Sequence, residues 1–165
     1  MMLASKKFRI VAMCATFALT RQLAAQDRTA IALTQYQHES DPVRKARILI
    51  KLGDDQVEEA KKRLKDGEDV ASLHILELYR DEVKETVAGL EAGGVDAEKK
   101  PGGFKELQIS LRETVRRVDD LILTLPVDKR PFFREVRTDL ANAQNELIDS
   151  LFPRKPNQSP KKANP

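Results

Sequence analysis

Residues 41–67 read DPVRKARILIKLGDDQVEEAKKRLKDG, and this stretch decides the fold class. Its apolar or small residues recur at alternating intervals of three and four, at Val43, Ala46, Ile50, Gly53, Val57, Ala60 and Leu64. Such spacing places these side chains on one face of an α-helix. Asp41-Pro42 is typical of a helix start and Asp66-Gly67 of a helix end. The stretch therefore predicts one continuous amphipathic helix.

Small residues form part of that predicted face. Ala46, Gly53 and Ala60 stand seven residues apart, so they share one heptad position. A glycine in particular lets a neighbouring group come close to the helix backbone. We therefore expect a second helix to approach this one closely along these positions.

The same periodicity predicts three further helices. Apolar side chains with three- and four-residue spacing occur over residues 69–92, 104–125 and 128–152. Asp128 is the expected cap of the last helix, and Pro131 fits within its first turn. Together with the first stretch, these segments predict four helices of similar length.

The connections between the helices predict how they are arranged. A turn of a few residues joins the first two helices and forces an antiparallel hairpin over residues 41–92, and a second hairpin is expected over 104–152. Residues 93–103 between them are rich in glycine and charge, which predicts a flexible connector. The expected fold class is all-α: an antiparallel four-helix bundle made of two helical hairpins, within a domain spanning residues 26–152.

Residues 1–25 have the three parts of a secretory signal peptide. A basic start precedes an apolar run over residues 10–19, and small residues follow at Ala24-Ala25. The run is far shorter than the about 20 residues that a membrane-spanning helix needs. We expect this segment to be cleaved, which leaves no integral membrane span in the mature protein. A periplasmic or secreted location follows from that interpretation.

Cys14, the one cysteine of the chain, lies inside that apolar run. A lipoprotein would carry its lipid at such a cysteine, but bulky Met13 stands where a small residue is required. We interpret Cys14 as apolar filler. Removal of the signal then leaves a mature chain without cysteine, which folds without a disulfide.

Charge is unevenly distributed along the chain, whose formal net charge is +3. Residues 1–25 and 153–165 contain basic but no acidic side chains, whereas residues 26–152 contain more acidic than basic ones. An acidic domain argues against nucleic acid as a partner, because phosphate binding needs a basic surface. We expect the basic, proline-rich tail over residues 153–165 to be disordered. Its cations are candidates for weak contact with an anionic envelope surface: Arg154, Lys155, Lys161 and Lys162.

The sequence holds few side chains suited to catalysis or metal binding. His74 and Glu77 stand one helical turn apart, but di-metal bundles use Glu-x-x-His motifs, and neither His38 nor His74 has a glutamate three positions before it. The sequence contains no glycine-rich phosphate loop, no Gly-x-Ser-x-Gly motif and no zinc-spaced set of cysteine and histidine. We therefore expect no cofactor, no metal and no enzymatic activity.

An acidic cluster over residues 54–59 lacks the alternating acids and central glycine of a calcium loop. Two of its members stand four residues before a basic side chain, as Glu58 before Lys62 and Glu59 before Arg63. This order favours ion pairs along a helix. The cluster is interpreted as a solvated helix face.

Residues Leu33-Thr34-Gln35-Tyr36-Gln37 read Leu-Thr-x-x-Gln. This pattern resembles the motif of the LTxxQ family of small periplasmic helical chaperones and stress adaptors. The resemblance implies an all-helical, exported and cofactor-free protein. The alternative interpretation is that these residues are an ordinary lead-in to the helix that starts at Asp41-Pro42.

Two function classes remain open at this point. The first is a non-catalytic, exported helical bundle that acts as a binding or scaffold module in a bacterial envelope and has a protein partner. The alternative is a periplasmic holdase chaperone or stress adaptor that binds unfolded clients. The two differ in whether the protein suppresses the aggregation of an unrelated client.

Overall fold

The structure is a computed structural model that describes residues 30–153 of the chain. Residues 30–38 are helical and belong to a unit that ends at Glu39, and a second unit begins at Ser40. The predicted signal peptide over residues 1–25 lies outside the described residues. The same holds for the tail after Pro153.

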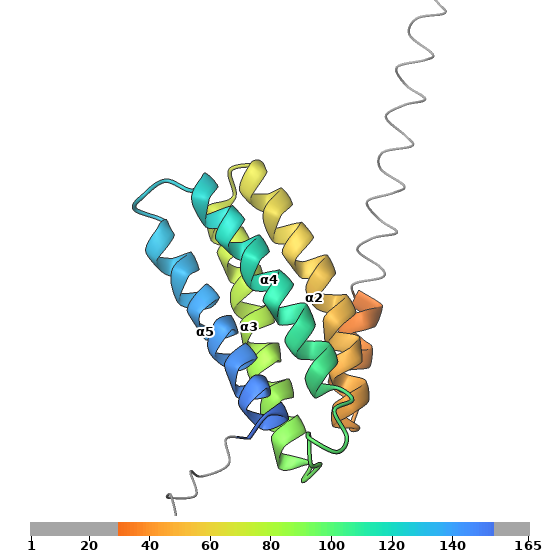
Figure 1. Ribbon diagram of the computed structural model, residues 1–165. Coiled ribbons are helices and arrows are strands. Elements are labelled where there is room, and N and C mark those ends of the chain that lie inside the picture. Colours follow the sequence, from red (N-terminus) through yellow and green to blue (C-terminus); the bar gives the residue numbers. More distant parts are fainter. Residues whose placement is uncertain (1–29, 154–165) are drawn as a thin grey trace, which may run out of the picture. The chain divides into compact units, whose positions relative to one another are not determined.

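The second unit consists of four long helices that pack as a bundle (Figure 1). They are α2 (Pro42–Lys65), α3 (Asp69–Ala92), α4 (Phe104–Thr124) and α5 (Arg130–Leu151). Helix α2 packs against α3 and α4, and α5 packs against the same two helices. The described residues contain no strand, so the predicted all-helical class and the helical bundle are confirmed.

Helix α2 begins and ends as its sequence predicts. The Asp41 carboxylate accepts a hydrogen bond of 2.7 Å from the backbone N–H of Arg44, and Pro42 is the first helical residue. At the other end Gly67 has a φ of +79°, a conformation that glycine adopts without steric cost. The Glu68 N–H then donates to the Arg63 carbonyl at 2.9 Å. This bond pattern closes the helix in the manner of a Schellman motif.

One local prediction was wrong. Helix α5 begins at Arg130 with Lys129 as its cap residue, so Asp128 is not the cap. The reason is a turn before the helix, in which the Lys129 N–H donates to the Pro126 carbonyl at 3.1 Å and takes Asp128 into the loop. Residues 30–38 form a further helix, in addition to the four that the sequence predicts.

The segment between α3 and α4 is folded into turns. The Asp96 carboxylate accepts hydrogen bonds from the backbone N–H groups of Glu98 and Lys99, and Ala97 is only 5% exposed. Gly103 has a φ of +84°, and a Cβ atom there would lie 3.3 Å from the Cα of Val43. The flexibility predicted for residues 93–103 stays a prediction.

The apolar face of α2 is wider than its heptad pattern indicates. Ala46, Val57 and Ala60 are buried as expected, but Leu49 and Leu52 are fully buried as well. The difference arises because α2 packs against two helices rather than one. Each neighbour needs its own stripe of apolar side chains.

The predicted close approach to α2 is confirmed at two of the small residues. A Cβ atom on Gly53 would lie 2.3 Å from Cε2 of Tyr79, so the tyrosine ring of α3 rests directly on the α2 backbone. About two turns further along, the Ser72 hydroxyl donates to the Ala60 carbonyl at 2.8 Å. Burial raises the pKa of the Tyr79 hydroxyl to about 12.

The Gly53 contact generates a stability prediction. Gly53→Ala gains helix propensity but places a methyl group inside the Tyr79 ring, and overpacking of this kind costs about 1–3 kcal/mol. Gly89→Ala is the matched control, because a Cβ at this helical glycine has no neighbour within 4 Å. That control should stabilise the fold by about 0.5–1 kcal/mol. Urea unfolding measures both, and two variants of equal stability would contradict the packing.

Candidate functional site: a groove between α2 and α4

Ion pairs hold α2 and α4 together over much of their length. Nε of Arg47 lies 2.8 Å from a carboxylate oxygen of Glu106. Further along, the Arg117 guanidinium lies 2.8 Å from Asp54 and 3.0 Å from Glu58. The residue numbers rise together along both helices, so α2 and α4 run in parallel.

The Arg117 contacts revise one sequence prediction and leave another intact. Glu58 pairs with Arg117 across the two helices rather than with Lys62 of its own helix. The predicted pair between Glu59 and Arg63 is confirmed at 2.7 Å. Part of the acidic cluster therefore joins two helices instead of facing only solvent.

The last ion pair between α2 and α4 is the one at Glu58. One turn further along, a groove lies between the two helices. Lys61 on α2 and Asp120 on α4 occupy the next positions, but no ion pair joins them. The space between the helices has a volume of about 400 Å³. Its apolar lining comes from both helices and the loop after α4: Val57, Leu64, Leu121, Leu125 and Pro126.

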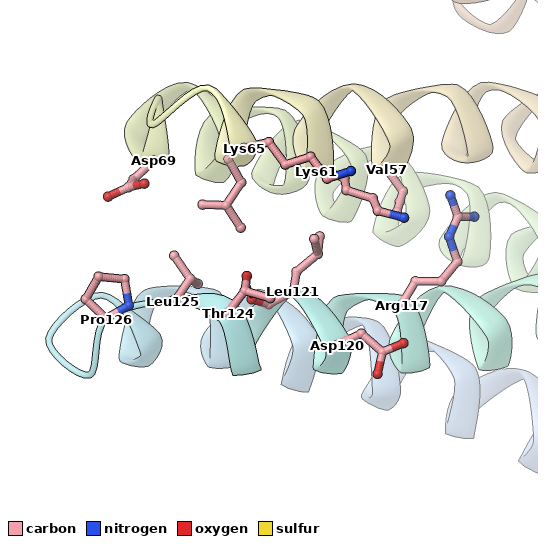
Figure 2. A pocket seen from close by; sticks show the side chains of 11 residues that line it. Val57, Lys61, Lys65, Asp69, Arg117, Asp120, Leu121, Thr124, Leu125 and Pro126 are labelled. Atoms are coloured by element: carbon pink, nitrogen blue, oxygen red, sulfur yellow. The ribbon is translucent and has the colours of Figure 1, made fainter.

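Five charged side chains line the groove, and three of them are cationic: Lys61, Lys65 and Arg117, with Asp69 and Asp120 as the two carboxylates. Figure 2 shows Lys65 and Lys61 extending along α2 toward Arg117, whereas the Asp120 carboxylate points away from α2. Lys61 and Lys65 are exposed, and no ion pair joins either to another side chain of residues 30–153. The groove therefore has an apolar lining and a cationic edge.

Exposed apolar side chains occur at the same end of the bundle. Leu123 and Val127 are 72% and 75% exposed near the loop between α4 and α5, and Phe132 follows at the start of α5. Val70 at the start of α3 is also exposed, and the ion pair between Lys129 and Asp69 brings this helix start near the loop. We call Val70, Leu123, Val127 and Phe132 the loop-end residues. Clustered exposed apolar side chains of this kind are typical of interaction surfaces.

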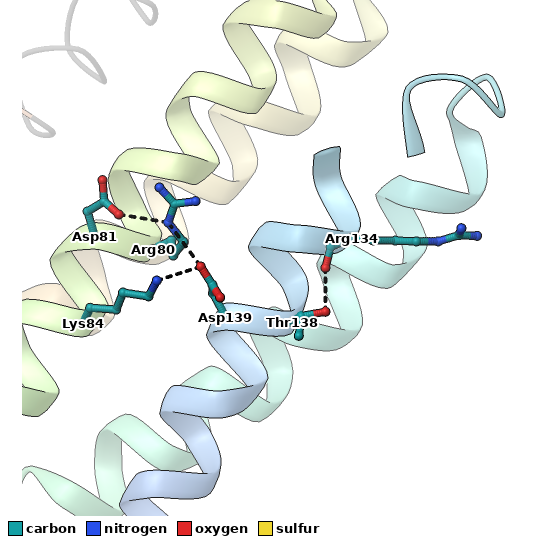
Figure 3. A network of polar contacts seen from close by, with 6 residues as sticks. All are labelled: Arg80, Asp81, Lys84, Arg134, Thr138 and Asp139. Carbon is teal, nitrogen blue, oxygen red and sulfur yellow. Dashed lines mark hydrogen bonds and ion pairs between the residues drawn. The ribbon is translucent and has the colours of Figure 1, made fainter. Parts of the chain in front are cut away.

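The opposite pair of helices is linked by a separate polar network. Figure 3 shows the Asp139 carboxylate of α5 between two basic side chains of α3. It lies 2.7 Å from Nζ of Lys84 and 3.7 Å from Nε of Arg80, which also contacts Asp81 at 2.9 Å. These ion pairs join α3 to α5.

The structure separates the residues that the sequence analysis considered for chemistry. His74 lines a shallow surface depression with Lys129 and has no cluster of metal-binding side chains around it. Across residues 30–153 no group of three or more histidine, cysteine, aspartate or glutamate side chains is placed to hold a metal. The tail cations Arg154, Lys155, Lys161 and Lys162 lie outside the described residues.

Sequence reasoning missed the groove. The available signal was the four-residue spacing of Lys61 and Lys65, which puts both ammonium groups on one helix face next to Leu64. The sequence could not show that α2 and α4 separate at that level. Among the described helices, none combines the length and apolar character needed to span a membrane.

Comparison with protein-family models, curated proteins and solved structures finds no match for this chain. The resemblance of residues 33–37 to the LTxxQ motif therefore rests on those residues alone. The groove and its surroundings are the basis on which a function is proposed below.

Two glutamates that contact α2 differ in the direction of their pKa shifts. The pKa of Glu106 is lowered, chiefly by its hydrogen bond to Arg47. The pKa of Glu82 on α3 is raised, chiefly by burial, although its carboxylate accepts a hydrogen bond of 3.0 Å from Gln56. Ionised Glu106 therefore stabilises the fold, and ionised Glu82 destabilises it.

Matched substitutions test this difference. Glu106→Gln should lower the melting temperature at pH 7, because it removes the stabilisation that the ionised carboxylate gives the folded state. That stabilisation is present above the pKa of Glu106 in the unfolded chain and is lost as the pH falls through its lowered pKa in the folded protein. Glu82→Gln should raise the melting temperature, because it removes a penalty that grows as the pH rises through the folded pKa. Both differences should shrink toward about pH 3, below the ordinary glutamate pKa of about 4.3. Thermal melts across this pH range contradict the assignment if both variants shift in the same direction at pH 7.

Proposed function

We propose that the protein is a non-catalytic, exported binding or scaffold module whose binding surface is the loop end of the bundle. In this proposal residues 1–25 are a signal peptide that is removed on export. The mature bundle then consists of two antiparallel hairpins, over residues 41–92 and 104–152. The basic tail adds weak contact with an anionic envelope surface.

Side-chain contacts support the hairpin arrangement. Lys45 of α2 pairs with Glu85 of α3 at 2.6 Å, and the later Ala60 of α2 contacts the earlier Ser72 of α3. Residue numbers that rise on one helix while they fall on the other are typical of antiparallel packing. In the second hairpin, Arg137 of α5 lies 3.0 Å from Asp119 of α4. These contacts, with the short turns, support two hairpins.

The observation that carries the proposed function is the coincidence of the groove with the loop-end residues. Leu123 and Val127 are among the most exposed apolar side chains of the described residues. A partner that covered them would remove this apolar surface from water. The groove lining also supports a binding role over a catalytic one. Its one hydroxyl, on Thr124, donates to the Leu121 carbonyl at 2.7 Å and is engaged within the helix.

A photoreactive residue at Val127 tests the loop end in the native compartment. We expect one discrete protein adduct, which Leu123→Glu should abolish because it places a charge within the apolar contact. The matched control is Ile109→Glu, an equivalent change on the same helix at an exposed apolar residue far from the loop end. Both variants should keep the melting temperature of the parent protein. Adduct formation that is equally sensitive to the two changes would contradict a binding surface at the loop end.

The holdase chaperone remains the second candidate, and the exposed loop-end residues also favour it. A holdase suppresses aggregation of an unrelated unfolded protein, whereas a scaffold module does not. Light scattering of a heated client protein in the presence of this chain distinguishes the two. Many crosslinked adducts in place of one would accompany the chaperone result.

Export generates a separate prediction about the amino terminus. The mature chain should begin near Gln26, because signal cleavage follows the small residues at Ala24-Ala25. The intact mass of the protein recovered from the envelope or the medium measures this directly. A recovered chain that retains residues 1–25 would contradict cleavage.

A further inference from the structure

The dimensions of the groove suit a small apolar chain. Its volume of about 400 Å³ falls within the range of about 300–1,000 Å³ that ligand pockets occupy. Leu121 and Leu125 on the α4 side are buried, and Leu64 across from them is half-buried. These walls face the same space from two helices, so a hydrocarbon chain placed there would contact apolar atoms on both sides.

The cationic edge of the groove suits one anionic group at the end of that chain. Arg117 is occupied by Asp54 and Glu58, which leaves Lys61 and Lys65 as the ammonium groups at the groove. Of the two carboxylates that line the groove, Asp69 lies 3.9 Å from Nζ of Lys129, and Figure 2 shows Asp120 directed away from α2. The alkyl stems of the two lysines also extend the apolar wall while their charged ends meet solvent.

From this combination we propose that the groove binds a straight-chain fatty acid of about ten carbons. Its acyl chain lies between Leu64 on α2, Leu121 on α4 and Leu125 directly after α4. Its carboxylate is bound by Lys61 and Lys65. This inference rests on the proposed binding function and names the ligand class of the same site.

Titration of the purified full-length protein with sodium decanoate, below the concentration at which decanoate forms micelles, tests the proposal. Calorimetry measures the affinity, and methyl NMR locates the site. We expect saturable binding with the largest shifts at the methyl groups of Leu64, Leu121 and Leu125. Decylammonium has the same chain with the opposite charge, and it should bind at least about tenfold more weakly, a difference of about 1.4 kcal/mol.

Paired substitutions on α2 separate the lysine contacts from a general charge effect. Lys61→Glu with Lys65→Glu should weaken decanoate binding at least about tenfold. Lys51→Glu with Lys62→Glu makes the same change in net charge at exposed lysines that do not line the groove, and it should leave the affinity unchanged. Lys61→Gln with Lys65→Gln removes the two positive charges without adding negative ones, and it should also weaken decanoate binding.

Several results would overturn the proposal. They are absence of decanoate binding, equal binding of decylammonium, methyl shifts confined to another part of the bundle, and equal loss of affinity in the control pair. The crosslink at Val127 is independent of this titration. If that crosslink persists while decanoate fails to bind, only the ligand class is wrong, and the groove is a contact for the protein partner. If both fail, the proposed function is wrong as well.

Discussion

The contact between the Tyr79 ring and the backbone of Gly53 is the constraint on which the rest of the bundle depends. A ring that rests on a helix backbone sets the separation of α2 and α3 at mid-length, because any side chain at residue 53 would occupy the space of the ring. The ring is fully buried, so it contributes a large apolar surface to the core.

The groove depends on the contacts between α2 and α4, at a distance from the Tyr79 ring. Helix α2 packs closely against α3 at Gly53 and Ala60, and the ion pairs of Arg47 and Arg117 join it to α4. Once the ion pairs of Arg117 end, nothing draws α2 and α4 together at the loop end. The apolar side chains there, including Leu64 and Leu125, line a space instead of filling it. The apolar space between α2 and α4 at this end is thus the physical basis of the proposed binding site.

The sequence predicted most of the fold because local signals and tertiary packing agree in α2 and α3. Heptad spacing, the Asp41 cap and the Gly67 terminus each act through neighbouring residues, and the structure has the helix between them. Prediction failed where distant residues decide the outcome. The displacement of Asp128 is a local exception, because its turn closes on the nearby Pro126 carbonyl. The groove depends on the packing of two helices that are far apart in sequence. The pairing of Glu58 with Arg117 rather than Lys62 has the same origin, since a periodic pattern does not show which helix lies opposite.

Solution NMR of the Gly53 α-protons provides the most direct measurement of the central contact. A tyrosine ring stacked on this backbone shifts those protons upfield through its ring current and gives strong nuclear Overhauser effects to the ring protons of Tyr79. The account predicts both observations in the folded protein. Gly53 α-protons with ordinary helical shifts and no Overhauser effect to Tyr79 would contradict it, because α2 and α3 would then be separated where the structure brings them closest.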